Sequence, residues 1–147
     1  MRVTAKGRYG LAAMIHLAQQ KEGECVPVIH ISEKLDISKI YLEQVFALLK
    51  RGGLVSSIKG SQGGYQLTKL ASDITVYEIM KATEVAVFEG TKATVEGLAP
   101  EIDKAMAIKI FEPLDQAVTS MLQSVSLQDL VEEVATQEDN EGYMFFI

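Results

Sequence analysis

Two short helical patterns followed by a glycine-rich hairpin constrain the fold of this chain more than any other feature. Apolar residues recur at helical spacing over residues 28–35 and again over 39–51, and only three residues separate the two patterns. A Gly-Gly pair ends the second pattern, and two strand patterns follow at 54–59 and 65–67. The glycines within 60–64 tolerate the positive φ that a tight loop requires. These residues predict two helices joined by a tight turn and followed by a β-hairpin.

Two further helical patterns flank this unit. Residues 8–20 form an amphipathic pattern before it, and 75–84 form another after it, with Thr75 as the expected N-cap. Ser38 is placed to cap the helix over 39–51. The predicted buried stripe of that helix comprises Leu42, Val45, Phe46 and Leu49. Three helices, a tight turn between the second and third, and a hairpin describe a winged helix-turn-helix, which is mainly α with a small β-hairpin as its wing.

Charge is divided unequally along the chain, whose net charge is −6. Residues 1–84 hold eleven Lys and Arg against eight Asp and Glu, whereas residues 85–147 hold three against twelve. The first part is therefore basic, at +3, and the second strongly acidic, at −9. Because surface charge governs partners rather than fold, the basic part is the candidate for binding DNA. We expect the acidic part to face a partner chain, a small-metabolite effector or a regulatory enzyme.

The acidic part is predicted to be a linker followed by helices. Residues 1–84 are expected to be the DNA-binding domain, 85–99 the linker, and 100–147 a helical region for dimerisation or effector binding. Pro100 suits a helix start, and Pro113 predicts a bend or a new helix start. The chain therefore divides into one DNA-binding domain and one helical extension.

An apolar stripe follows that second proline and predicts a dimer interface. Ser126 and Asp129 then match a capping pattern at the start of a final helix. In an isolated protomer the stripe would be exposed, so a second copy of the chain is expected to cover it. The stripe at helical spacing consists of Leu114, Ala117, Val118, Met121, Leu122 and Val125.

The outward residues of the predicted third helix, the wing and the N-terminal arm are candidates for contacting DNA. Near the start of a recognition helix, Gln can pair with adenine, Glu can accept from cytosine, and hydroxyls can serve bases or phosphates. Basic residues at the helix end, in the wing and in the arm suit phosphates. The candidates are Arg2, Lys6, Arg8, Ser38, Lys39, Tyr41, Glu43, Gln44, Lys50, Arg51, Lys59 and Gln62.

Three segments together resemble the Rrf-two family of bacterial regulators, namely MRVTAKGRYGLAAM, ISKIYLEQVFALLKRGGLVSSIKG and GGYQL. The resemblance covers residues 1–84 and implies a homodimeric DNA-binding repressor or activator whose long helix in the second half packs against its partner. It implies DNA contact by Ser38, Tyr41, Glu43 and Gln44, and by Lys59 in the wing. Many relatives carry Arg at this wing position, and Lys keeps the charge but loses the bidentate fork.

A departure from the family pattern bears on cofactors. Members that carry an iron–sulfur cluster, such as IscR, place three cysteines just after the helix that here ends near Glu84. Residues 85–99 contain no cysteine, so we expect no cluster, no other cofactor and no metal. The family also includes the nitric-oxide regulator NsrR and cluster-free members. The ending GYMFFI is similar to the tail of the cysteine-metabolism repressor CymR, which favours that cluster-free type.

Cys25 is the sole cysteine, and two interpretations of it stay open. It is either a half-buried side chain without a task or a redox sensor beside the helix-turn-helix. His16 and His30 have no Cys or carboxylate at metal-ligand spacing, and no catalytic motif is present. We therefore expect no enzyme. No apolar run suits a membrane span or a secretory signal, so a cytoplasmic location is expected.

These features predict a homodimeric transcription regulator, expected to be a repressor, that reads a pseudo-palindromic operator through its recognition helix and wing. Control of sulfur or cysteine metabolism is the pathway that the tail favours. The alternative is a winged-helix module that has lost DNA binding and contacts proteins instead.

Overall fold

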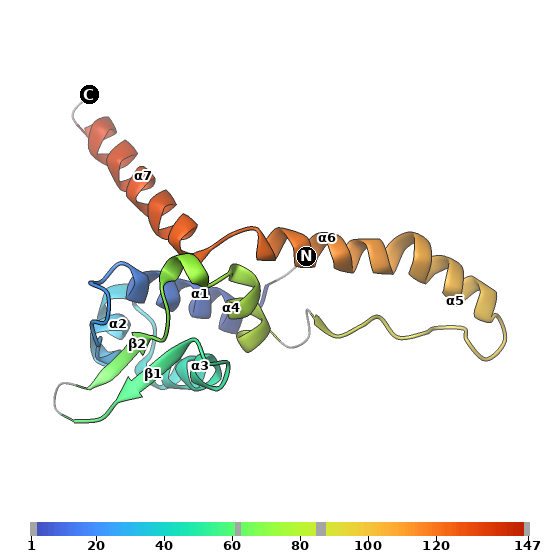
Figure 1. Ribbon diagram of the computed structural model, residues 1–147, viewed down its shortest axis with the longest axis horizontal. Coiled ribbons are helices and arrows are strands. Elements are labelled where there is room, and N and C mark those ends of the chain that lie inside the picture. Colours follow the sequence, from blue (N-terminus) through green and yellow to red (C-terminus); the bar gives the residue numbers. More distant parts are fainter. Residues whose placement is uncertain (1–2, 61–62, 85–87, 146–147) are drawn as a thin grey trace.

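The computed structural model describes residues 3–60, 63–84 and 88–145. It forms a helical body that carries a β-hairpin, and two helical segments project from this body (Figure 1). The elements follow one another as α1 (Ala5–Ala18), α2 (Val28–Leu35), α3 (Lys39–Arg51), β1 (Val55–Ile58), β2 (Gly64–Leu67), η1 (Ala71–Asp73), α4 (Val76–Thr83), α5 (Pro100–Met106), the π-helical segment η3 (Ala107–Phe111), α6 (Glu112–Gln123) and α7 (Leu127–Phe145).

The ends of α2 and α3 match the sequence prediction because the residues that stop and start them are specific. Asp36 adopts the left-handed conformation, at φ 54°, and so ends α2. The Ser38 hydroxyl then accepts the backbone N–H of Tyr41, at 3.2 Å, and caps α3. The first helix begins three residues earlier than predicted, since the side chain of Thr4 caps it by accepting the N–H of Gly7.

The wing is an antiparallel hairpin that the helices hold on two sides. Val55 pairs with Leu67 at its base and Ile58 with Gly64 near its tip. Val26, in the loop between α1 and α2, adds a bridge to Tyr65 on the outer edge of β2. A Cβ atom at Gly64 would lie far inside van der Waals contact with the Val26 carbonyl, so the close approach of the two backbones requires glycine there.

The core forms where α1, α2, α3, α4 and the base of the hairpin meet. The predicted inner stripe of α3 is fully buried, as is Ile79 of α4. One core residue, Leu127, comes from the far end of the chain, where its N–H donates to the carbonyl of Ile74 at 2.8 Å. We call residues 3–84, with Leu127, the body. Its largest fully buried side chains are Phe46, Met14, Ile31, Leu42, Leu49, Ile74, Ile79, Leu127 and Val45.

Helices α5, η3 and α6 follow one path that leads away from the body, and we call residues 100–123 the arm (Figure 1). At Pro113 the expected bend or new start takes the form of a π-helical segment that ends directly before α6. Within it the N–H of Glu112 donates to the carbonyl of Ala107, five residues back. Since proline has no N–H and its ring crowds the preceding turn, this wider turn lets the helical path continue past it.

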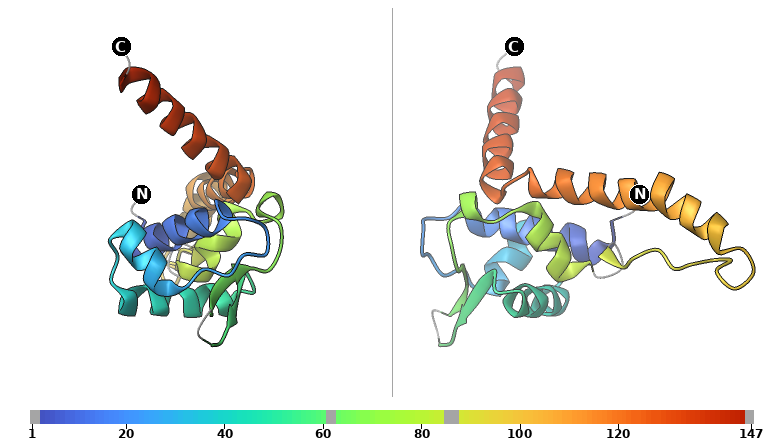
Figure 2. Two further views of the ribbon diagram at one scale, coloured as in Figure 1. Left: turned by 90° about the vertical axis from the view of Figure 1, so that its left-hand side faces the viewer. Right: turned by 45° about the vertical axis from the view of Figure 1, so that its right-hand side comes forward.

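The last helix, α7, begins at Leu127, where the chain returns from the arm to the body. Ser126 and Asp129 cap it reciprocally, since the N–H of each residue donates to the side chain of the other, at 2.9 and 3.0 Å. From there α7 projects from the body in a direction of its own (Figure 2). Within the described residues, no helix combines the length and the apolar character that a membrane span requires.

Candidate DNA-binding surface

Helix α3 has one face in the core and the opposite face in solvent. Its buried side chains leave an exposed stripe spaced three or four residues apart along the helix. Helix α3 and the hairpin lie together on the side of the body opposite α7, as the views in Figures 1 and 2 agree. A recognition helix presented in this way can enter the major groove of DNA. The exposed stripe consists of Ile40, Glu43, Gln44, Ala47 and Arg51.

The start of α3 is fixed by its cap and by an aromatic contact. Because the Ser38 hydroxyl oxygen accepts the cap hydrogen bond, its own hydrogen is left for a phosphate or a base. Tyr41 is half-buried, and its ring meets that of Tyr9 on α1 edge to face, with centroids 5.2 Å apart. The contact orients α3 against α1. Tyr41 is therefore less available to DNA than the exposed stripe beside it.

Glu43 and Gln44 are both exposed, as a base-reading role requires. Glu43 forms an ion pair with Lys39 one turn earlier, at 3.9 Å between Nζ and Oε1. An exposed pair of this kind contributes at most about 1 kcal/mol, so DNA can displace it at little cost.

Burial, and then the charge of Glu43, raise the pKa of the Tyr65 phenol.

The wing is anchored to the recognition helix by stacking and by a hydrogen bond. The rings of Phe46 and Tyr65 stack with centroids 4.3 Å apart and planes 11° apart. Lys50 Nζ donates to Ser57 Oγ on β1 at 2.8 Å. A hollow of about 550 Å³ lies between α2, α3 and the wing. Its lining includes Lys39, Glu43, Ser57, Ile58, Lys59 and Gly60.

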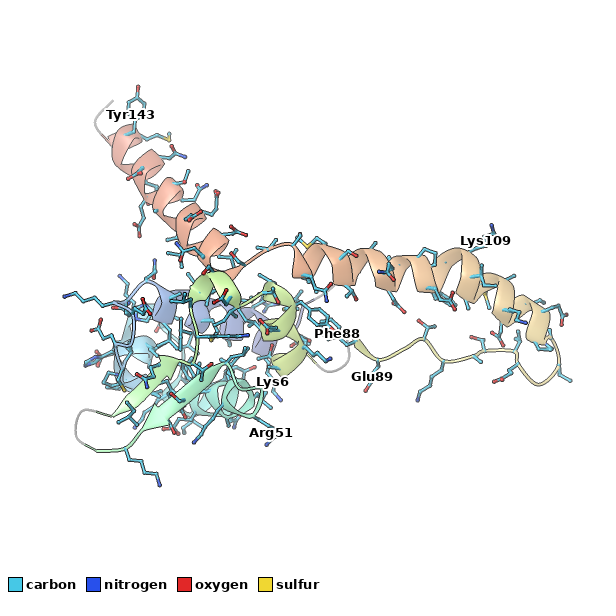
Figure 3. The ribbon with its side chains drawn as sticks, in the orientation of Figure 1. Lys6, Arg51, Phe88, Glu89, Lys109 and Tyr143 are labelled. Carbon is cyan, nitrogen blue, oxygen red and sulfur yellow. The ribbon has the colours of Figure 1, made fainter. Side chains whose placement is uncertain are left out.

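The predicted basic residues are exposed where the structure describes them. Lys50, Arg51 and Lys59 are solvent-exposed, and so are Lys6 and Arg8 near the start of α1. Arg2 and Gln62 lie outside the described residues. Figure 3 shows the labelled Lys6 and Arg51 on the body, and Lys109 and Tyr143 far from it on the arm and near the tip of α7. Cations in two separate parts of the body can thus reach phosphates.

A buried carboxylate that residue spacing did not predict contacts Thr4, the residue that caps α1. Glu84 follows α4 and is 2 % exposed. Its Oε1 accepts hydrogen bonds from the backbone N–H and the hydroxyl of Thr4. A Cβ atom at Gly7 would collide with this carboxylate, so a larger residue there would force the Glu84 side chain to shift. Glu84 thereby ties the linker end of α4 to the helix that carries Lys6 and Arg8.

The single cysteine lies in a loop and not on α3. Cys25 is half-buried in the loop between α1 and α2, next to the bridge from Val26 to Tyr65.

Burial, and then the charge of Lys34, lower the pKa of His16. In the ranges that the structure describes, no three His, Cys, Asp or Glu side chains gather closely enough to hold a metal ion.

Comparison with known proteins gives the family. A family model named Rrf2 and described as an iron-dependent transcriptional regulator matches residues 3–133. The chain is 38% identical to the transcriptional regulator IscR of Photorhabdus laumondii over 146 residues, which cover 96% of this chain and 88% of the relative. It is 40% identical to IscR of Escherichia coli O1:K1 over 131 residues, which cover 89% and 80%.

Solved structures agree with the sequence relatives. The structure of CymR, described as the global cysteine regulator of B. subtilis, is similar with a TM-score of 0.70 and 31% identity, covering 90% of this chain and 98% of that one. IscR of T. potens gives a TM-score of 0.68 and 30% identity, covering 91% and 88%. These matches confirm the winged-helix fold and do not separate the IscR from the CymR subtype. The chain belongs to the Rrf2 family, and it is a DNA-binding transcriptional regulator and not an enzyme.

Proposed function

We propose that the regulator acts as a homodimer in which two copies of α3 and of the wing read the two halves of a pseudo-palindromic operator. A two-fold axis between protomers presents the same surface twice, and operators of helix-turn-helix dimers mirror that symmetry. The exposed stripe of α3, the hollow beside the wing and the exposed cations of the body supply base and phosphate contacts in each half-site.

The observation that carries the dimer is the apolar surface of the arm. Ile102, Ile108, Ile110, Leu114 and Met121 are each more than half exposed. Their exposure on a helix that leaves the body calls for a covering surface, because large apolar patches on soluble proteins mark interfaces. A second arm is the occupant that fits best, since it offers the same apolar side chains to an isologous contact. Val118, Leu122 and Val125 are only partly exposed and border this surface.

We further propose that the dimer works without an iron–sulfur cluster. Such clusters are held by several cysteine thiolates, whereas this chain has one cysteine, and it lies before α2 rather than in the linker. The chemistry of the available donors therefore does not fit a cluster. Repression of sulfur or cysteine metabolism is supported by the CymR-like ending.

Selection of duplexes from a random pool, followed by affinity measurements across a salt series, tests the operator proposal. The expected result is enrichment of a palindrome whose affinity falls steeply as salt rises, because the exposed Lys and Arg side chains release counterions from phosphates. Absence of any enriched sequence at low salt would contradict operator reading and favour a module that contacts proteins. Iron and sulfide analysis of anaerobically purified protein tests the cluster proposal, and stoichiometric iron would contradict it.

A further inference from the structure

The exposed stripe of α3 contains one large apolar side chain, that of Ile40. It is 73 % exposed, and no other large apolar side chain in the described part of residues 3–84 is as exposed. The sequence analysis placed Ile40 neither in the buried stripe of α3 nor among the candidates for DNA contact. Ile40 lies outside the core of the body, because the four buried residues of α3 lie on the opposite face of the helix.

The position of Ile40 on α3 places its exposed side chain where a recognition helix contacts bases. It lies in the first turn of α3, two residues after the cap, and its neighbours one turn along the same face are Glu43 and Gln44. The N-terminal residues of a recognition helix are those that contact base edges. Once α3 lies in the major groove, Ile40 therefore reaches the bases beside those that Glu43 and Gln44 contact.

Base edges in the major groove offer one apolar group, the C5-methyl of thymine. We propose that Ile40 packs against a thymine methyl in each half-site and so makes the regulator select thymine at that position. This inference rests on the proposed operator reading and names a further residue that determines its specificity. Serine or lysine at this position would be cheaper to expose in the free protein, whereas isoleucine gains by burial only when an apolar partner arrives.

Replacing thymine by uracil removes the methyl and leaves every hydrogen-bonding group in place, so it isolates the proposed contact. Burial of one methyl contributes about 0.8 kcal/mol. Symmetric replacement in the selected operator should then weaken binding about fourfold per half-site at the contacted position, or about fifteenfold for the dimer. Uracil at other positions should change affinity little.

The test measures the thymine-to-uracil affinity ratio for the full chain and for Ile40→Ala at each thymine of the selected operator. The ratio should fall to one for Ile40→Ala at the contacted position. Leu70→Ala removes an exposed apolar side chain elsewhere on the body and should keep the wild-type ratio. Ile40→Val keeps a branched side chain at the same place and should keep most of the discrimination, while thermal unfolding checks that each variant folds.

Two results would overturn the proposal and are distinguishable from failure of the proposed function. Selective operator binding with a ratio of one at every thymine would remove the methyl contact and leave operator reading intact. An equal ratio for the full chain and Ile40→Ala would assign the discrimination to another side chain. Equal binding of all duplexes would instead overturn operator reading, and this proposal with it.

Discussion

The body and the arm use apolar side chains in opposite ways. In the body, Phe46, Leu42 and Leu49 are fully buried by other parts of the same chain. On the arm, Leu114 and Met121 are more than half exposed. The body therefore holds the interactions that stabilise its own fold, whereas the arm is a helix whose apolar side chains are left for another surface to cover. Under the proposed dimer, the body folds on its own core and the arm associates with a second copy.

The largest effect is expected from placing charge on the arm. With Leu114→Asp and Met121→Asp together, each protomer would carry two unpaired carboxylates into the proposed dimer interface, and an unpaired buried charge costs several kcal/mol. The dimer dissociation constant should rise by more than about 100-fold. Sedimentation velocity measures this. Unchanged association would show that the exposed arm is not the interface, and unfolding of the body should be unaffected in either case.

Removal of a core side chain should act on the body instead. Phe46→Ala deletes a fully buried ring that also stacks on Tyr65, and such truncations cost about 3–5 kcal/mol of unfolding free energy. Leu127→Ala should cost about 2–5 kcal/mol by the same mechanism, although Leu127 comes from the acidic part of the chain. Urea unfolding measures both. A loss below about 1 kcal/mol for Leu127→Ala would contradict its inclusion in the core.

Gly7→Ala tests the junction between α1 and the end of α4. A methyl group there collides with the buried Glu84 carboxylate, and overpacking of this kind costs about 1–3 kcal/mol. Gly90→Ala is the matched control, because a Cβ atom at Gly90 meets nothing within 4 Å. Thermal unfolding distinguishes the two variants. Equal melting temperatures would mean that Glu84 moves aside freely and does not fix the start of α1.

The salt dependence of DNA affinity should change when a cation of the body is removed and stay the same when a cation of the arm is removed. Lys59→Ala removes a wing cation and should reduce the slope of log affinity against log salt by about 1 per protomer, with weaker binding to all sequences. Lys109→Ala removes a cation of the arm, far from α3 and the wing (Figure 3), and should leave the slope unchanged. Equal slopes for Lys59→Ala and the unaltered protein would exclude Lys59 from phosphate contact.

The smallest effect is expected at the single cysteine. Cys25 is half-buried and lies outside the exposed stripe of α3. Cys25→Ser should change operator affinity less than about twofold under reducing conditions, in line with substitutions away from a binding surface. The same affinities are then measured after treatment of both proteins with stoichiometric peroxide. Weaker operator binding by the oxidised chain, with no response of Cys25→Ser, would establish the redox-sensor interpretation.

The sequence predicted the body far better than the arm, for physical reasons. Ser38 and Asp36 mark the ends of α3 and α2 through local backbone chemistry, and these signals are visible in the residues themselves. The inner stripe of α3 follows from helical periodicity alone. By contrast, the π-helical path before Pro113 depends on a balance between proline sterics and the continuation of a helix, and residue spacing carries no signal for it.

The candidate site was predicted in part. Glu43, Gln44 and the basic residues that the structure describes are exposed, as polar residues opposite an apolar stripe are expected to be, and their contact with DNA stays a prediction. Burial of Glu84 was not foreseen, since a carboxylate at a helix end is ordinarily expected in water. Ile40 was missed because only polar and charged residues were considered for DNA contact, although helical spacing places Ile40 opposite the buried stripe.

The most direct test of the account is the number of chains bound to the selected operator, measured by analytical ultracentrifugation together with the affinity for a single half-site. If the arm makes the dimer and the body reads DNA, two chains bind one palindrome, and a duplex with one half-site binds at least about 100-fold more weakly because half the contacts are lost. One chain on a single half-site, with the same affinity as on the palindrome, would contradict the division of labour between body and arm.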